Sequence, residues 1–228
     1  MSTPLRPGWR GCPPAQPVRV AGRYARLEPL RDALHGDALF AACSVADAPA
    51  RFRYLFDEPP ADRAALAAWI DARAALSDPL FFAVVDLASG QAQGRQALMR
   101  IVPEHGVIEI GHIYWGPAIA RTRVATEAQY LLARHVFRDL GYRRYEWKCD
   151  ALNAPSRAAA LRFGFRFEGI FRQHMVIKGR NRDTAWFAMI DAEWPVLEAG
   201  YERWLDPANF DAGGRQRRTL QQCIAAVA

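Results

Sequence analysis

The sequence predicts one α/β domain of the α+β kind, in which a mixed, largely antiparallel central sheet is flanked by helices. The chain has 228 residues, of which 51% are hydrophobic, so it can bury one substantial core. Three apolar extended segments, at residues 80–87, 96–102 and 107–115, follow one another with only short turns between them. Segments with helical periodicity precede and follow this group.

Ahead of these apolar segments, the sequence predicts one strand and two helices. Residues 23–27 are expected to form the strand. Asp32 is a good N-cap for a helix that ends near Ser44, and apolar side chains recur along this helix at helical spacing. Pro60 suits the first turn of the second helix, which Ser77 terminates.

The three apolar segments are predicted to form an antiparallel meander. Ser89 and Gly90 separate the first two segments, which indicates a hairpin, and a turn at Gly106 leads into the third. A helix is expected over residues 124–140. Its apolar side chains fall on one stripe, and Gly141 is a favourable residue to end it.

The remaining elements are predicted to be a strand, a helix, a hairpin and a terminal helix. Asn153 and Pro155 are expected to open the first helix, which closes at Gly164, and Gly179 lies in the hairpin turn. The expected ranges are residues 144–149, 165–170, 174–178 and 183–191 for strands and residues 193–205 for the final amphipathic helix.

The chain is expected to contain one folded domain with an appendage at each end. Residues 1–18 hold five prolines among small residues, which predicts an irregular N-terminal arm. Residues 193–228 are expected to form a C-terminal helix and a polar tail that pack on the domain or extend it. The aromatic residues near this end are expected in the core or in a packing seam, with a homodimer interface as the alternative. They are Trp186, Phe187, Trp194 and Trp204.

Composition limits the classes of function. No apolar run approaches the roughly 20 residues that cross a bilayer, and the N-terminal sequence lacks a signal-peptide core, so a cytoplasmic location without membrane contact is expected. The cysteines form no CxxC pair and the histidines have no ligand spacing, so no metal is expected. The net charge of +6 fits an anionic ligand. Nucleic acid is not expected as a partner, except through docking on a ribosome.

The segment between the third apolar strand and its following helix predicts an anion site. Arg121 and Arg123 lie in the turn at residues 121–126, where the first helical amides have no intrahelical partner. These amides and the helix dipole attract phosphate, and a guanidinium can bind it with two hydrogen bonds. A surface turn with solvated arginines is the alternative.

Three motifs resemble the GNAT superfamily of acetyl-CoA-dependent N-acetyltransferases. They are EIG at residues 109–111, RTRVATEA at 121–128 and NAPSRAAALRFGFRFEG at 153–169. The order of the expected elements is similar to that family, and the sequence is most similar to its Rim-type branch, which acetylates ribosomal-protein N-termini. The resemblance implies a GNAT-like domain at residues 19–192, in which two strands splay apart at the cofactor site.

The resemblance also implies acetyl-CoA as a co-substrate and assigns residues to its site. The family's cofactor loop usually has small residues where this chain has Val124 and Thr126. Val124 is therefore expected to crowd a diphosphate, and Thr126 to donate a hydroxyl hydrogen bond to it. The residues expected to bind the cofactor are Ile113, Tyr114, Trp115, Arg121, Thr122, Arg123, Val124, Ala125, Thr126, Asn153, Ser156 and Arg157.

The implied reaction is direct attack of a primary amine on the thioester in a ternary complex. Glu109 is the candidate base, and a strand carboxylate paired with an arginine is the alternative. Many family members place a tyrosine near the departing thiolate, where this chain has Ala160. Ser156 or water then supplies the proton, or the thiolate leaves without help.

The acceptor is left open between a protein N-terminal α-amine and a small-molecule amine. Neutralising a lysine at pH 7 costs about 4 to 5 kcal/mol, whereas an α-amine costs only about 1 kcal/mol. An α-amine would therefore require much less from Glu109. Because Val124 and Ala160 depart from the family pattern, a catalytically weak acyl-CoA-binding or regulatory module is the alternative function.

Overall fold

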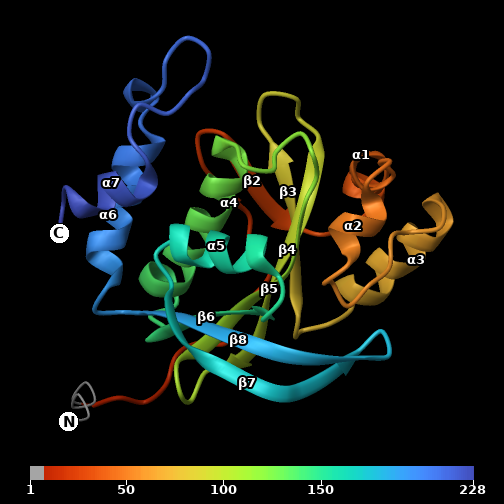
Figure 1. Cartoon of the computed structure of the whole chain (residues 1–228), viewed down its shortest axis with the longest axis horizontal. Helices are drawn as coiled ribbons and strands as arrows, with labels where there is room; N and C mark the ends of the chain where they lie inside the picture. Colours follow the sequence, from red (N-terminus) through yellow and green to blue (C-terminus); the bar gives the residue numbers. More distant parts are fainter. Residues whose placement is uncertain (1–7) are drawn as a thin grey trace.

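The computed structural model describes residues 8–228, so residues 1–7 of the predicted arm lie outside the described part. Its centre is an eight-stranded sheet in the order β1-β2-β3-β4-β5-β6-β8-β7 (Figure 1). Neighbouring strands are antiparallel except β5 and β6, which confirms the predicted mixed, largely antiparallel sheet. The strands are β1 (Val20–Ala21), β2 (Ala25–Pro29), β3 (Leu80–Asp86), β4 (Ala92–Val102), β5 (Val107–Trp115), β6 (Arg144–Asp150), β7 (Arg166–Ile177) and β8 (Arg180–Ile190).

Helices cover both faces of the sheet, and the alternation of side chains along each strand decides what each face buries. In β3, Phe82 and Val84 belong to the main core, whereas Phe81 and Ala83 belong to a smaller second core. Helices α1, α2 and α3 pack on the second core, while α4, α5, α6 and α7 pack on the main core (Figure 1). The helices are α1 (Asp32–Cys43), α2 (Ala48–Phe52), α3 (Arg63–Ala74), α4 (Arg123–Arg134), α5 (Ala154–Arg162), α6 (Trp194–Leu205) and α7 (Leu220–Ala225).

The meander and the helix after it agree with the sequence-based prediction. Strands β3, β4 and β5 pair consecutively and antiparallel. The predicted helix at residues 124–140 is α4, which continues as a π-helical turn over His135–Asp139. The chain then reverses at Gly141, whose φ of 69° favours glycine. Within residues 8–228, no helix has the length and apolar character required to cross a membrane.

Two helix starts on the second-core side differ from the prediction. Asp32 does not cap α1, because the N-cap is Arg31 and no side chain caps the helix. Asp32 instead pairs with Arg63 across two helices at 2.7 Å. The second predicted helix is α3, which begins later than expected, since Asp62 caps it by accepting a backbone hydrogen bond. Pro60 therefore lies in the preceding loop.

Two short helices and one continuous strand were not expected. Helix α2 has only five residues, which is too short to show a periodic pattern. Helix α7 lies in the predicted polar tail and begins with a capping box between Thr219 and Gln222. The strands expected at residues 165–170 and 174–178 form the single strand β7, whose pairing with β8 shifts register between Phe171 and Met175.

Glu127 in α4 fixes the N-terminal strands to the helix. Its carboxylate, which is buried, accepts hydrogen bonds from the backbone amides of Arg23, Tyr24 and Ala25 at 2.9, 2.6 and 2.7 Å. Hydrogen bonds to an ionised buried group are stronger than those between neutral groups. This glutamate belongs to the TEA sequence of the helix, and its role here is to bind the turn between β1 and β2.

Glu127→Gln is expected to lower the free energy of unfolding by about 2 to 3 kcal/mol, because one acceptor oxygen becomes an amide donor facing backbone N–H groups. Urea titration followed by circular dichroism measures the change. Glu104→Gln is the matched control, since Glu104 is exposed and should change stability by less than about 0.5 kcal/mol. Equal stability of the two variants would contradict the anchoring role.

Candidate functional site

Strands β5 and β6 separate partway along their length and leave a notch in the sheet. They pair in parallel only from Val107 to Ile110 on β5. Beyond this point β5 contains a bulge against β4, since its pairing moves from Ala97↔Gly111 to Arg95↔Tyr114. His112 lies in the bulge with φ of 49°, a left-handed conformation that is uncommon for a residue with a side chain. The predicted splayed strand pair is confirmed.

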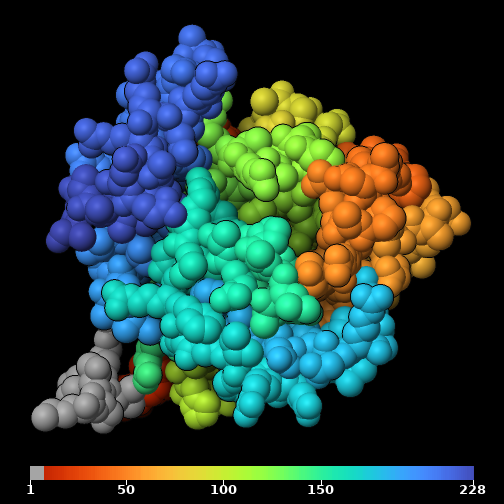
Figure 2. Space-filling view, viewed as in Figure 1, coloured from red at the N-terminus to blue at the C-terminus, as the bar shows by residue number. Residues whose placement is uncertain are grey.

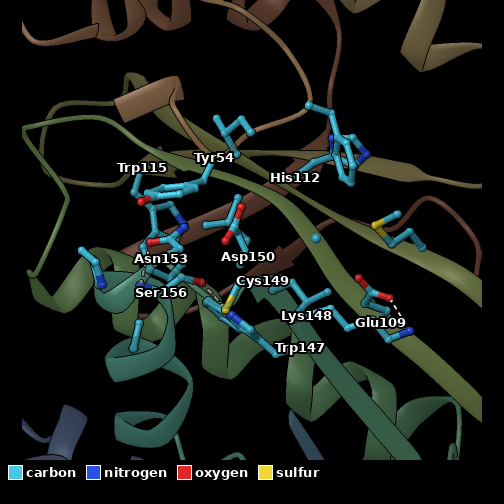
Figure 3. Close-up of a pocket in the computed structure, with 18 of the residues that line it drawn as sticks. Tyr54, Glu109, His112, Trp115, Trp147, Lys148, Cys149, Asp150, Asn153 and Ser156 are labelled. Atoms are coloured by element: carbon cyan, nitrogen blue, oxygen red, sulfur yellow. Dashed lines mark hydrogen bonds and ion pairs between the residues drawn. The ribbon is translucent and has the colours of Figure 1, made fainter. Parts of the chain in front are cut away.

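A cavity of about 260 Å³ occupies this notch (Figure 3). Its walls come from β5, β6, the start of α5, the loop after α2, and Arg182 of β8. Figure 3 shows Glu109 and Lys148 toward one end of the cavity, and Trp115, Asn153 and Ser156 toward the other. One end is therefore strongly charged, whereas the other is lined by aromatic and small polar side chains.

A second, larger groove continues from the polar end of the cavity. Trp115, Pro155 and Ala159 line both spaces, so the two adjoin beside the start of α4 and along α5, and they are together called the channel. The outer groove is lined by four arginines and no aspartate or glutamate. Its electrostatic potential favours an anion. The arginines are Arg121, Arg123, Arg162 and Arg215.

The turn before α4 lies in this outer groove, and several of its polar groups bond to one another. Thr122 is the N-cap, and its hydroxyl accepts from the amide of Val124 at 3.2 Å. Thr126 donates its hydroxyl to the carbonyl of Thr122 at 3.1 Å and accepts from Arg162 at 3.1 Å. The Thr126 hydroxyl thus shapes the turn rather than standing free for a phosphate.

Val124 does not narrow the groove as the sequence suggested. Its side chain is half-buried and packs against the main core. The groove wall at this turn is instead made by its neighbours Arg121, Thr122, Arg123 and Ala125. The helix geometry explains the difference, because successive side chains point about 100° apart and the valine falls on the inner side.

Two other residues assigned to the cofactor have side chains outside the channel. Tyr114 is buried in the second core and donates its hydroxyl to the carbonyl of Ala42 at 2.6 Å. Ile113 and Trp115 do line the cavity, because alternate residues of a strand face the same side. Arg157 donates to the carbonyl of Ala151 at 3.3 Å, away from the cavity lining.

Glu109 is buried and lies between two cations. Its Oε2 atom is 2.6 Å from Arg100 and 2.8 Å from the ammonium of Lys148. Lys148 is itself buried, pairs with Glu146 at 2.7 Å and lies over the ring of Trp186 at 3.7 Å. Both contacts of Glu109 use the same oxygen, which leaves Oε1 outside them. The arginine pairing that the sequence offered as the alternative to a base is therefore present, and the same carboxylate also lines the cavity.

Asp57 and His112 form a second polar group at the cavity that the sequence did not reveal. His112 lines the cavity, and its Nδ1 lies 3.8 Å from Asp57, which also accepts from the buried guanidinium of Arg95 at 2.9 Å. Burial raises the pKa of the Asp57 carboxyl. The contact with His112 and the charge of Arg95 lower this pKa by more than burial raises it, so the net pKa lies well below its usual value. Asp57 comes from a loop, and no local motif marks it.

Ser156 lies beside the aromatic end of the cavity. Its hydroxyl accepts from the indole of Trp147 at 3.0 Å and also interacts with the thiol of Cys149. Asn153 uses its side-chain oxygen to cap α5, as predicted, by accepting from the amide of Ser156 at 3.1 Å. Ala160 is fully buried in the main core and does not line the cavity.

Comparison with protein families and solved structures agrees with this geometry. Residues 25–166, well over half of the chain, match the model of the acetyltransferase (GNAT) domain. No curated protein sequence matches the chain. A GCN5-related N-acetyltransferase from Brucella melitensis has 60% sequence identity and a TM-score of 0.94, covering 96% of this chain and 99% of its own.

Two further structures extend the comparison. A probable acetyltransferase of the GNAT family from Chromobacterium violaceum has 45% identity and a TM-score of 0.78, over 86% of this chain and 97% of its own. The ribosomal-protein-S5-alanine acetyltransferase from Vibrio fischeri has 16% identity and a TM-score of 0.61, over 78% and 98% of the two chains, which shows a shared fold. The chain belongs to the GNAT superfamily and is a GNAT-type acetyltransferase.

Proposed function

We propose that the protein transfers an acetyl group from acetyl-CoA to a primary amine by direct attack in a ternary complex. The observation that carries the proposal is the channel, in which an arginine-lined groove adjoins a cavity lined by a buried carboxylate. The groove suits the phosphates of the co-substrate. The surface of Trp115, Pro155 and Ala159, which the groove and the cavity share, suits its extended pantetheine arm.

The splayed strands provide the means to polarise the thioester. At the bulge, His112 and Ile113 together oppose a single residue of β4, so the regular ladder of backbone hydrogen bonds is interrupted there. A backbone amide released at this point can donate to the thioester oxygen as negative charge develops on it. Ile113 and Trp115 hold the acetyl group against the notch by lining it.

The charged end of the cavity provides the base in this proposal. Glu109 accepts a proton from the ammonium, and the neutral amine nitrogen then attacks the carbonyl carbon. The carbon–sulfur bond breaks and the nitrogen loses its second proton, while the sulfur leaves as a thiolate that takes up a proton relayed through Ser156 or supplied by solvent. Arg100 and Lys148 both contact Oε2 of Glu109, while Oε1 stays outside these contacts and can take the proton.

The acceptor is proposed to be an α-amine, such as a protein N-terminus. Removing a proton from an α-amine requires several kcal/mol less than removing one from a lysine, so an α-amine demands less of Glu109. The acceptor enters past Tyr54 and Phe56, which line the cavity from the loop after α2. These two side chains make the entrance aromatic.

The function is tested by calorimetry with acetyl-CoA, followed by thiol-release assays on paired peptides. One peptide has a free N-terminus and no lysine, and its partner has an acetylated N-terminus and one lysine. We expect acetyl-CoA to bind, and turnover at pH 7 to be at least about 10²-fold faster on the free N-terminus. Absence of acetyl-CoA binding would overturn the proposal. Binding without turnover on any amine would favour a regulatory acyl-CoA-binding module.

A further inference from the structure

The C-terminal segment supplies one wall of the outer groove. Helix α6 and the loop after it contribute Trp204, Phe210, Gly214, Arg215 and Gln216 to the lining. These residues lie beyond residues 25–166, the part that matches the family domain. In Figure 2 the C-terminal segment, in blue, stands beside the surface formed around α4 and α5.

The loop is held in place by its own hydrogen bonds before any ligand arrives. The Asn209 amide donates to the carbonyls of Trp204 and Arg218 at 3.1 and 3.2 Å, and its oxygen accepts from the amide of Arg218 at 3.0 Å. The carboxylate of Asp211 accepts from the amides of Gly213 and Arg215 at 2.9 Å each. The wall is therefore preorganised, which lowers the entropy lost on binding.

The loop also locks onto the turn before α4. The guanidinium of Arg123 lies 4.7 Å from the ring centres of both Tyr24 and Phe210. Such cation–π contacts bind the N-terminal strands, the phosphate turn and the C-terminal loop to one another. Arg123 thus links the C-terminal loop to the turn before α4, while Arg121 and Arg215, which also line the groove, are exposed.

Arg162 is a partly buried charge in the groove, and no carboxylate within residues 8–228 pairs with it. It donates to the Thr126 hydroxyl and lies over the ring of Trp204 at 5.1 Å. Burial lowers the pKa of this guanidinium, and Tyr201 offsets the effect only in part. An anion in the groove would supply the missing counter-charge, and the exposed guanidinium of Arg215, which lines the same groove, would bind that anion as well.

We propose that the C-terminal segment forms the subsite for the 3′-phosphorylated adenosine end of the co-substrate, with Arg215 and Arg162 binding its phosphate. This inference rests on the proposed use of acetyl-CoA. It assigns a binding role to a part of the chain outside the family-matched domain. The phosphate turn before α4 binds the diphosphate, and the arginines of the outer wall bind the third phosphate.

Calorimetry on Arg215→Ala with acetyl-CoA and with 3′-dephospho-CoA tests the assignment. We expect the wild-type protein to prefer the 3′-phosphorylated ligand by about tenfold or more, and the variant to lose most of that preference. Affinity for 3′-dephospho-CoA should stay within about twofold. Arg217→Ala is the matched control, because Arg217 is exposed in the same loop but does not line the groove.

The outcomes separate this inference from the proposed function. If the wild-type protein binds acetyl-CoA and Arg215→Ala retains the full preference for the 3′-phosphate, the assignment to the C-terminal segment is overturned. If the wild-type protein binds no acetyl-CoA, the proposed function fails as well. If Arg215→Ala leaves coenzyme binding intact but abolishes salt-sensitive binding of a short RNA, the groove wall serves nucleic acid instead.

Discussion

Glu109→Gln is expected to lower turnover at pH 7 by about 10²- to 10⁴-fold, because the amine loses the group that accepts its proton. Affinity for acetyl-CoA should change by less than about twofold, since Glu109 lies at the end of the cavity away from the outer groove (Figure 3). Glutamine keeps the shape of the side chain, and Lys148 keeps its contact with Glu146. Steady-state kinetics and calorimetry measure the two quantities.

The pH profile separates a base from a structural residue. Above a pH of about 8, a free α-amine is already largely neutral, so the variant should recover much of the lost rate. A deficit that stays constant at every pH, or unchanged turnover, would remove Glu109 from this role. His112→Gln is the companion variant, because His112 lines the same cavity. A selective loss at neutral pH in that variant alone would assign the base to the histidine.

Asp57→Asn is expected to lower the free energy of unfolding by about 3 to 5 kcal/mol, because it leaves a buried charge without its partner. Arg95 has a side chain only 3% exposed, pairs with Asp57 at 2.9 Å and lies 4.3 Å from the ring centre of Trp69. Asp57 also accepts from the indole of Trp69 at 2.9 Å. Chemical denaturation at pH 7 measures the loss.

A surface variant and low pH provide the controls for Asp57. Asp37→Asn breaks an ion pair with Arg63 in which the aspartate is 95% exposed, so it should cost less than about 1 kcal/mol. The pKa of Asp57 is lowered in the folded protein, so its contribution is present above the ordinary aspartate value of about 4 and is lost as pH falls further. The difference between wild type and Asp57→Asn should therefore narrow below about pH 4. If the difference in unfolding free energy stayed the same at every pH, the charge of Asp57 would not be its cause.

The sequence predicted elements well where the signal was local and long enough. The meander and α4 each show a repeated pattern over many residues, and they lie where expected. The short helices α2 and α7 lack that length, and the capping by Asp32 was wrong because Arg63 binds its carboxylate from another helix. A cap is judged from neighbours in sequence, whereas the side chain binds whichever partner packing provides.

The residues of the candidate site likewise fall into those that local sequence predicted and those that it did not. The turn at residues 121–126 and the start of α5 follow from residues adjacent in the chain, and they lie on one channel. The involvement of Asp57, His112 and the C-terminal loop had no local signal. Ile113, Tyr114 and Trp115 were all assigned to the cofactor site. Successive side chains of a strand face opposite sides of the sheet, so Tyr114 is buried in the second core while its two neighbours line the cavity.

By itself, the sequence determined the class of sheet, the order of strands and helices around the phosphate turn, and the family resemblance, because these depend on periodicity and on motifs of adjacent residues. The tertiary structure alone decided which partner each charged side chain contacts. Glu109 pairs with Lys148, Asp57 pairs with Arg95, and Arg123 lies over the ring of Phe210 only once the sheet and its covering helices have packed together. Such contacts join residues distant in sequence, so burial and packing select the partners.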